Sequence, residues 1–296
     1  ADDMIDARKR LREAGSDARL VAKIERTEAI ENLEEIIAAS DVVLIARGDL
    51  GVEIGDAELP GLQKLITSKS LEQNRVVITA TQMMQSMVES PIPTRAEVLD
   101  VANSVFDGTD AVMLSAETAV GRHPDTVVEA MNRICIGAER HAQTRPDCEH
   151  LNVQFQRIDQ AIAMAAMFMA TNVSVQAIVA LTESGSTAQW LSRIRSDVPI
   201  FALSQLRDSR RRMALYRGVY PIAHEFPSAD VEETLAGGVH LLFKQGFIKA
   251  GDRVILTMGE NTGCEGGTNS LRLVQIGEDG YVEQNPSLDI CPIDLG

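Results

Sequence analysis

The chain has 296 residues, of which 45% are apolar and 24% are charged, and its formal net charge is −15 at pH 7. This length and composition predict a globular protein of two domains, because a domain takes roughly 150 residues, and they exclude a disordered chain, a fibrous repeat and a small disulfide scaffold. The excess of acidic residues argues against binding along a nucleic-acid backbone, which requires clustered positive charge.

Three further features predict the cellular setting. The longest apolar stretch, residues 161–170, is shorter than the roughly 20 residues needed to span a bilayer. The first residues, ADDMIDARKR, do not resemble a signal peptide. The four cysteines are far apart and form no C-x-x-C pair, which argues against a zinc site and favours free thiols in a reducing compartment. We therefore expect a cytoplasmic protein that binds neither a membrane nor nucleic acid.

The first 140 residues alternate short apolar runs with longer amphipathic segments. The apolar runs cover residues 20–24, 42–46, 76–78 and 112–114. Between them, apolar residues recur at the three-to-four spacing of one helix face, as at Leu59, Leu62, Leu65 and Ile66. This alternation predicts parallel β-α-β units, whose strands are apolar on both faces because helices cover them.

Each of these four runs continues into polar residues. These residues are, in chain order, Lys23 and Glu25; Arg47, Gly48 and Asp49; Thr79, Thr81 and Gln82; and Ser115 and Glu117. Because the carboxyl ends of parallel strands meet at one edge of a sheet or barrel, we expect them to form one site. A period of two places Lys23 and Glu25 on one face, and likewise Arg47 and Asp49.

The residue types at this edge indicate the chemistry. Glu25 and Asp49 offer hard oxygen ligands for Mg²⁺ or Mn²⁺, and Lys23 is a compact cation suited to a phosphoryl or enolate oxygen. Gly48 lets the backbone approach a ligand and present N–H groups to a carboxylate. Thr81 adds a hydroxyl and an N–H group at the adjacent strand end. Together they predict phosphoryl transfer or enolate chemistry on a small anion.

The second half of the chain predicts another α/β domain over residues 159–280. A polar connector, residues 141–158, precedes an apolar helix at 160–171, and we assign no role to the tail at 281–296. The predicted strands cover residues 177–181, 200–203, 219–223, 254–257 and 271–276. Strands alternating with helices again predict a smaller, doubly wound α/β domain.

A run of hydroxyl residues follows the first strand of this second domain. It holds Thr182, Ser184, Gly185, Ser186 and Thr187 and leads directly into a helix. Hydroxyl and N–H donors at a helix start can hold a phosphate. A simple N-cap would also account for these residue types, so the sequence pattern leaves both interpretations open.

Four segments resemble pyruvate kinase. They are AKIE at residues 22–25, ARGDLGVEI at 46–54, ITATQMMQSM at 78–87 and PTRAEVLDVANSVFDGTDAVMLSAET at 93–118. They stand in the order and at the separations of that family. With the C-terminal region, the resemblance covers roughly residues 1–280, and its LSAET wording resembles the bacterial type.

The resemblance implies a fold and a reaction. Residues 1–140 would form strands five to eight of a (β/α)8 TIM-type barrel, followed by the C-terminal effector-binding domain. The reaction would transfer a phosphoryl group from phosphoenolpyruvate to ADP and give pyruvate and ATP, with Mg²⁺ or Mn²⁺. The family also implies K⁺, a homotetramer, and a sugar phosphate or AMP as effector. The potassium ligands and the N-terminal half of the barrel would be absent, so the isolated chain is expected to lack turnover.

The resemblance also implies roles for individual residues. Lys23 would stabilise the transferred phosphoryl group, and Glu25 and Asp49 would ligate the divalent metal. Gly48, Asp49 and Thr81 would hold the substrate, with its carboxylate against backbone N–H groups.

Further roles follow less closely from the same resemblance. Arg47 would lie beside the phosphate and the metal, and Ser115 and Glu117 would belong to a polar path that protonates the enolate. In the second domain, the effector would contact Thr182, Ser184, Gly185, Ser186 and Thr187. The facing loop would include Gly267, Thr268 and Asn269.

Two other functions share some of these features. A magnesium-dependent lyase on a similar barrel would use a glutamate, an aspartate and a metal-bound enolate of pyruvate, but it would not need the segment at residues 93–118. A non-catalytic sugar-phosphate-binding or assembly module would use only the hydroxyl-rich loop of the second domain.

Overall fold

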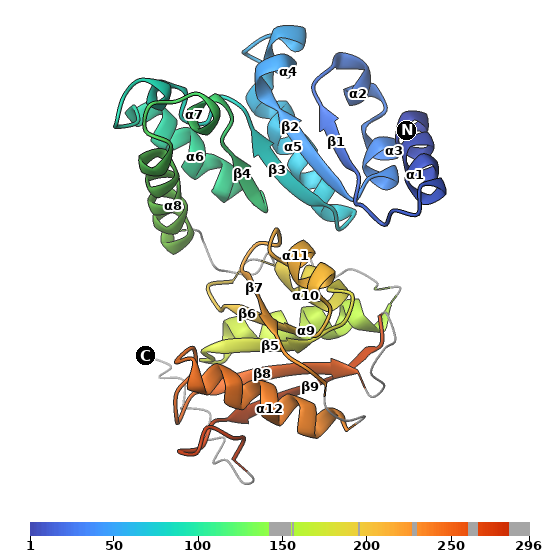
Figure 1. Cartoon of the computed structure of the whole chain (residues 1–296), viewed down its shortest axis with the longest axis vertical. Coiled ribbons are helices and arrows are strands. Elements are labelled where there is room, and N and C mark those ends of the chain that lie inside the picture. Colours follow the sequence, from blue (N-terminus) through green and yellow to red (C-terminus); the bar gives the residue numbers. More distant parts are fainter. Residues whose placement is uncertain (142–154, 156, 195, 227–229, 260–265, 284–296) are drawn as a thin grey trace, which may run out of the picture. The chain divides into compact units, whose positions relative to one another are not determined.

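The computed structural model describes residues 1–141, 155, 157–194, 196–226, 230–259 and 266–283. It divides the chain into two compact units, Ala1–Gln143 and Thr144–Gly296, and Figure 1 shows one sheet in each. Most of the predicted connector and most of the predicted tail lie outside the described residues, as do Cys148, Cys264 and Cys291.

The first unit is built on a parallel sheet in the order β1-β2-β3-β4. Its strands are β1 (Val21–Ile24), β2 (Val42–Ala46), β3 (Val76–Ala80) and β4 (Ala111–Met113). Its helices are α1 (Asp2–Glu13), α2 (Thr27–Glu31), α3 (Leu33–Ala39), α4 (Arg47–Ile54), α5 (Leu59–Glu72), the 3₁₀ helix η1 (Gln85–Val88), α6 (Arg95–Asp107), α7 (Ala116–Ala119) and α8 (Pro124–His141). This is the order expected of a partial barrel, and the predicted fold class is confirmed.

The two faces of this sheet differ in burial. Ile24, Val43 and Ile45 lie on the face that packs against α3 and α5 and are fully buried there. On the opposite face, Val21 is 49% exposed and Leu44 is half-buried, and the residues that are buried there, Val42, Ala46, Val76 and Ala80, do not belong to the cluster packed against α3 and α5. The expectation that helices cover both faces was therefore wrong for this unit. In a barrel-type sheet the crossover helices pack on the outer side only, whereas in an open doubly wound sheet they alternate between sides.

Asp41 ties the start of β2 to the residues before β1 and to α1. Its carboxylate accepts hydrogen bonds from the Leu20 N–H at 2.8 Å, from Arg8 at 3.0 Å and from Arg19 at 2.9 Å. Burial by itself raises the pKa of this carboxyl, but the hydrogen bonds from Leu20, Arg19 and Arg8 outweigh it and hold the pKa below its usual value. The charged carboxylate therefore stabilises the register of the first two strands.

The second unit holds a mixed sheet in the order β7-β6-β5-β8-β9. Its strands are β5 (Ala177–Leu181), β6 (Ile200–Ser204), β7 (Val219–Ala223), β8 (Arg253–Gly259) and β9 (Thr268–Gln275). Pairing is parallel except between β8 and β9. All five predicted strands are present. The last begins earlier than predicted because its first residues continue the antiparallel pairing with β8.

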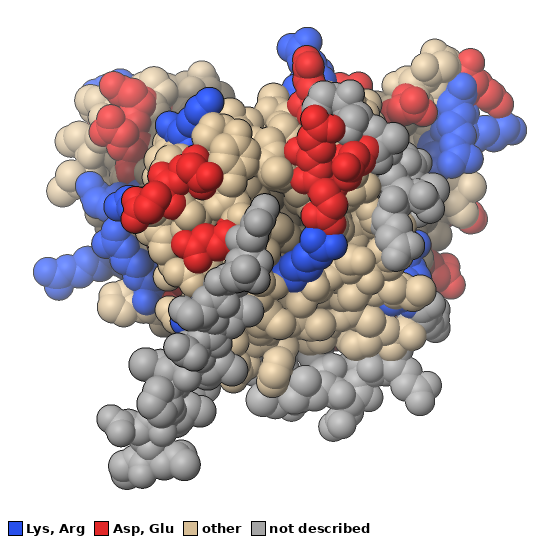
Figure 2. Space-filling view, turned by 90° about the horizontal axis from the view of Figure 1, so that it is seen from below, with Lys and Arg blue, Asp and Glu red and all other residues tan. Residues whose placement is uncertain are grey.

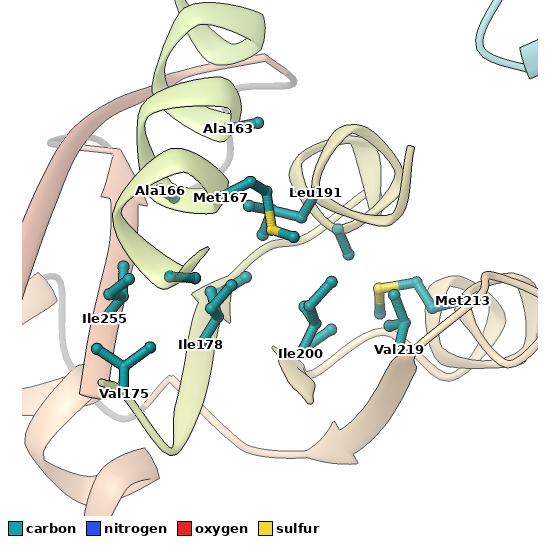
Figure 3. Close-up of a cluster of buried hydrophobic side chains, with 14 residues drawn as sticks. Ala163, Ala166, Met167, Val175, Ile178, Leu191, Ile200, Met213, Val219 and Ile255 are labelled. Carbon is teal, nitrogen blue, oxygen red and sulfur yellow. The ribbon is translucent and has the colours of Figure 1, made fainter. Parts of the chain in front are cut away.

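Helices cover both faces of this second sheet. They are α9 (Ile158–Asn172), α10 (Ser186–Ser192), α11 (Arg207–Met213) and α12 (Val231–Lys244). On one face, Met167 of α9 and Leu191 of α10 pack against Ile178 of β5, as Figure 3 shows. On the other face, Val239 and Leu242 of α12 pack against the sheet. Apolar layers on both sides of the sheet confirm the doubly wound arrangement.

The visible surface carries charges of both signs. On the face drawn in Figure 2, acidic and basic side chains are interspersed. None of the helices in the described residues combines the length and the apolar character that a membrane span requires.

Cys135 is a free thiol, and burial, followed by the nearby charge of Glu139, raises its pKa to about 11.

We predict that Asp41→Asn lowers the free energy of unfolding of the first unit by about 1–3 kcal/mol, because hydrogen bonds to a charged group are lost. The pKa of Asp41 in the folded state lies below the unfolded value of about 3.9. The charge therefore stabilises the fold above that pH, and the contribution disappears as the pH falls through the folded-state pKa. Urea unfolding followed from pH 7 down to pH 2 measures both effects.

Asp17→Asn, which changes an exposed carboxylate outside the helices and strands, is the control and is expected to behave as the wild type. An acid limb of the stability curve that is equally steep in Asp41→Asn and in the wild type would contradict this account of Asp41.

Candidate active site at the strand ends

Lys23, at the end of β1, lies between two carboxylates. Its Nζ donates a hydrogen bond to Oδ2 of Asp49 at 3.1 Å and also contacts the carboxylate of Glu25. The hydrogen bond with Glu25, followed by that with Asp49, raises the pKa of Lys23, and the hydrogen bond from Lys23 lowers the pKa of Asp49. All three side chains remain partly exposed, at 49% for Lys23, 33% for Glu25 and 62% for Asp49. They are therefore reachable by a ligand.

This pair of carboxylates fits a divalent cation such as Mg²⁺. Glu25 and Asp49 come from different strand ends, and both have oxygens within reach of one amino group. In the part of the chain that the structure describes, no three His, Cys, Asp or Glu side chains converge on one point. A metal at this place would take two protein ligands and complete its shell with water and substrate oxygens, which is how Mg²⁺ usually binds.

Gly48 and Thr81 join the ends of β2 and β3. The Gly48 N–H donates to the Thr81 hydroxyl at 2.7 Å, and that hydroxyl donates to the Ala80 carbonyl at 2.7 Å. A Cβ on Gly48 would lie 3.5 Å from Oγ1 of Thr81, which is an ordinary contact. The protein itself therefore does not require glycine here, and close approach by a ligand stays a prediction.

Two consecutive residues after β3 have left-handed backbone conformations. Thr81 has a φ of 67° and Gln82 a φ of 54°. For a β-branched residue such as threonine this conformation is a genuine outlier, and residues held in such regions cost on the order of 1–3 kcal/mol each. Such conformations persist where the surrounding structure fixes them, and they concentrate at functional sites.

Arg47 does not lie where the sequence pattern places it. A period of two predicts Arg47 and Asp49 on one face, but α4 begins at Arg47, so the two side chains are about 200° apart around the helix. The Arg47 side chain is only 7% exposed and donates to Asp100 at 2.7 Å and to the Thr81 carbonyl at 2.9 Å. Its guanidinium is thus directed into the interior, and its expected place beside the phosphate and the metal stays a prediction.

Glu117 joins the segments that follow β3 and β4. Its buried carboxylate accepts hydrogen bonds from the Met84 N–H at 3.0 Å and from the Ser115 N–H at 2.8 Å. Lys23 to Asp49, Gly48 to Thr81 and Met84 to Glu117 thus link all four strand ends in sheet order. The expectation that polar residues of the four strand ends gather at one edge is confirmed for these residues. Thr79 is an exception, because it lies within β3 and its buried hydroxyl donates to Thr109 before the start of β4.

Comparison with known proteins assigns both units of the chain to one family. Residues 1–128 match the family described as pyruvate kinase, barrel domain, and residues 160–274 match pyruvate kinase, alpha/beta domain. Together the two matches cover most of the chain. The chain belongs to the pyruvate kinase family.

Curated relatives give the same result. Pyruvate kinase II of Salmonella typhimurium is 50% identical over 279 residues, which are 93% of this chain and 58% of the relative. Pyruvate kinase of Haemophilus influenzae is 48% identical over 261 residues, with 87% of this chain and 54% of the relative covered. Pyruvate kinase of Geobacillus stearothermophilus is 41% identical over 256 residues, which are 86% of this chain and 43% of the relative. The chain spans about half the length of these pyruvate kinases.

Two side chains near the site were missed by the sequence reasoning. Asp100, the ion-pair partner of Arg47, lies 53 residues away in the chain, and no local pattern signals a pairing at that separation. Glu97 accepts hydrogen bonds from Thr94 and Ser86, which outweigh burial and lower its pKa. The spacing of Thr94 and Glu97 is that of a capping box and could have revealed this second contact.

The hydroxyl-rich loop of the second unit lies at the switch point of its sheet. It follows β5, whose two neighbours, β6 and β8, are reached by connections running to opposite sides. Ligands of open α/β sheets bind at such points. The Thr182 hydroxyl accepts a hydrogen bond from the Gly185 N–H at 3.0 Å, and Thr187 shares a 2.6 Å hydrogen bond with Thr268. The predicted proximity of Thr268 to this loop is confirmed.

Other hydroxyl groups of the loop also have partners within the chain. The Ser184 hydroxyl accepts a hydrogen bond from the Ser186 N–H at 3.3 Å, and the Ser186 hydroxyl donates to Asp159 at 3.4 Å. Asp159 is fully buried at the start of α9 and pairs with Arg157 at 2.8 Å. An aspartate just before an apolar helical run is a helix-start signal, and it could have drawn attention to this residue.

Gly185 is required by the loop itself. Its φ is 87°, and a Cβ there would lie 2.8 Å from Cγ of Met213. We predict that Gly185→Ala lowers the free energy of unfolding by about 1–3 kcal/mol, from backbone strain together with the contact. Thermal unfolding measures the loss.

Gly246→Ala is the matched control, because Gly246 also has a positive φ, 76°, but has open space around its Cβ position. It is expected to carry the strain without the contact and to be the milder variant. Equal losses in the two variants would show that Met213 does not restrict the loop.

Proposed function

We propose that this chain carries the metal and phosphoenolpyruvate side of a pyruvate kinase active site. The reaction is transfer of a phosphoryl group from phosphoenolpyruvate to ADP, which gives pyruvate and ATP in glycolysis in the cytoplasm. The observation that supports it is the contact of Lys23 with both Glu25 and Asp49 at the ends of neighbouring strands. A lysine and two carboxylates at one point suit a phosphoryl group and the divalent cation that accompanies it.

In this reaction the bond between phosphorus and the enol oxygen breaks while phosphorus bonds to the terminal phosphate oxygen of ADP. Lys23 donates hydrogen bonds to the phosphoryl oxygens and stabilises the negative charge they carry in the transition state. Glu25 and Asp49 would hold Mg²⁺ or Mn²⁺, which would supply positive charge to stabilise the phosphoryl and enolate oxygens. Because Lys23 is already charged and partly exposed, it can turn from the carboxylates toward the substrate without a change in protonation.

The substrate carboxylate binds at the start of α4. Gly48 and Asp49 occupy the first turn of this helix, where backbone N–H groups and the helix dipole favour an anion. The Thr81 hydroxyl accepts a hydrogen bond from Gly48 and donates to the Ala80 carbonyl, and it would turn its proton from Ala80 to the same substrate carboxylate. Ser115 and Glu117 supply the polar path by which the enolate takes a proton at carbon.

We further propose that the hydroxyl-rich loop binds a sugar phosphate or AMP as an effector. The proposed contacts are Thr182, Ser184, Gly185, Ser186 and Thr187. Support comes from the position of the loop at the switch point of the sheet. The intact protein would also use K⁺, with ligands outside this chain, and would form a homotetramer.

Two observations weigh against the other functions considered. The match over residues 160–274 extends through a domain that a lyase would not need. The contacts among Lys23, Glu25 and Asp49 have no use in a module that only binds sugar phosphates.

We predict that Mn²⁺ binds to this chain and that oxalate, which mimics the enolate of pyruvate, tightens the binding. Glu25→Gln is expected to weaken the binding of Mn²⁺ and of oxalate by about tenfold or more, because a carboxylate ligand of the metal is lost. Paramagnetic relaxation of water protons reports the metal, and a titration with oxalate reports the ternary complex.

Glu28→Gln, which removes an exposed carboxylate that pairs only locally with Arg26, is the control and is expected to bind as the wild type does. Binding of Mn²⁺ that is equally strong in Glu25→Gln and in the control would refute the proposed metal site.

For the effector, we predict that fructose 1,6-bisphosphate or AMP binds at millimolar concentration or below and that Ser184→Ala weakens binding, because a hydroxyl of the loop is lost. Isothermal titration calorimetry measures the affinity, with Ser68→Ala, on an exposed face of α5, as the control. The absence of heat with both ligands would end the effector proposal.

A further inference from the structure

The backbone after β3 adopts a conformation that its residue types do not favour. Among the described residues, the non-glycine positions with a positive φ are Asn74, Thr81 and Gln82. Asparagine often adopts this conformation, whereas threonine rarely does. Two such residues in succession require an external restraint.

The guanidinium of Arg47 contacts both carbonyl groups of this pair. Its Nη2 donates to the Thr81 carbonyl at 2.9 Å and to the Gln82 carbonyl at 3.2 Å, and its Nε also donates to Thr81 at 3.3 Å. On the other side of the fork, Nη1 donates to Asp100 at 2.7 Å and to Gln63 at 3.4 Å. A planar guanidinium can hold several acceptors at fixed angles, whereas the single ammonium group of lysine cannot.

The direction of these carbonyl groups determines where the Thr81 side chain lies. With its carbonyl turned toward Arg47, Thr81 presents its hydroxyl to the Gly48 N–H at 2.7 Å. A return of Thr81 to the usual right-handed or extended conformation would rotate the carbonyl and the side chain together. The hydroxyl would then leave the position beside Gly48.

A second buried charge fixes the far end of the same segment. Glu117 accepts the Met84 N–H at 3.0 Å, and the side chain of Met83 contacts the Arg47 guanidinium at 2.9 Å. Arg47, Met83, Met84 and Glu117 are all buried. The segment from Thr81 to Met84 is therefore held from inside the protein, while the Thr81 hydroxyl lies between the Gly48 N–H and the Ala80 carbonyl at the strand ends.

We propose that Arg47 is a positioning residue: its guanidinium holds the Thr81 and Gln82 carbonyls and so keeps the Thr81 hydroxyl in place for the substrate carboxylate. This inference rests on the proposed function only for the identity of the ligand. The effect on the Thr81 backbone follows from the contacts of Arg47 alone. It also explains why an arginine beside the site has a buried guanidinium.

The test compares Arg47→Lys with the wild type by two measurements. Backbone carbon-13 shifts and the amide–Hα coupling of Thr81 report its φ, and oxalate titration in saturating Mn²⁺ reports the ligand site. We expect Thr81 to lose its left-handed signature and oxalate affinity to fall about tenfold to 100-fold, because a hydrogen bond to a charged carboxylate is lost. Affinity for Mn²⁺ alone is expected to stay within twofold, a separation that a general loss of stability would not produce.

Arg8→Lys is the matched control, because Arg8 also bridges a backbone carbonyl, that of Ala39, and a carboxylate, that of Asp41, away from the site. It is expected to leave both readouts unchanged. Adding Gln82→Gly to Arg47→Lys supplies a residue that adopts a positive φ without strain, and it is expected to restore part of the oxalate affinity. If Arg47→Lys does not fold, the double variant is measured in its place. Its oxalate affinity is expected to fall by more than twofold, but by less than the fall expected for Arg47→Lys.

The outcomes separate the inference from the proposed function. A left-handed Thr81 in Arg47→Lys, or oxalate affinity within twofold of wild type in the variant measured, overturns the positioning role. A parallel loss of affinity for Mn²⁺ and oxalate overturns it as well, since it indicates a merely structural residue. If the wild type binds no oxalate but Thr81 changes conformation in Arg47→Lys, the positioning role stands and the proposed ligand is wrong.

Discussion

The contacts of Lys23 with Glu25 and Asp49 are the interaction on which the candidate site depends. Two carboxylates at neighbouring strand ends repel each other, and the ammonium group between them offsets that repulsion. Because the three side chains are partly exposed, the attraction is screened by water and the charges can exchange partners at low cost. Under the proposed function, Glu25 and Asp49 would hold a divalent cation, and Lys23 would then be available for a phosphoryl group.

Behind these exposed charges lies a buried layer that fixes the backbone. Arg47 reaches the carbonyls after β3 from one side, and Glu117 reaches the Met84 N–H from the other. Both side chains are buried and satisfy backbone groups that strand pairing leaves without partners. The partly exposed side chains of Lys23, Glu25 and Asp49 are available to a ligand, whereas the buried side chains of Arg47 and Glu117 fix the backbone behind them. This buried layer allows a strained residue, Thr81, to persist at the edge of the sheet.

Much of this could be predicted from the sequence, and the exceptions have physical reasons. Buried parallel strands appear as short apolar runs, so the limits of β2, β5 and β7 agree with prediction. Strand ends carry the polar residues, so the sequence pattern alone groups Lys23, Glu25 and Asp49. Arg47 was misplaced because the period of two was continued past Ala46, where α4 begins. Asp100 was missed because its pairing with Arg47 depends on the packing of α6, which no local pattern reveals.

The central claim is that Glu25 and Asp49 form one metal site with Lys23 beside it. Crystals of this chain grown with Mn²⁺ and oxalate, measured near the manganese absorption edge, locate the metal directly. We predict one anomalous peak at the strand ends, within coordination distance of carboxylate oxygens of both Glu25 and Asp49, with oxalate bound to the same ion. A manganese ion located elsewhere, or one bound by neither carboxylate, would contradict the account.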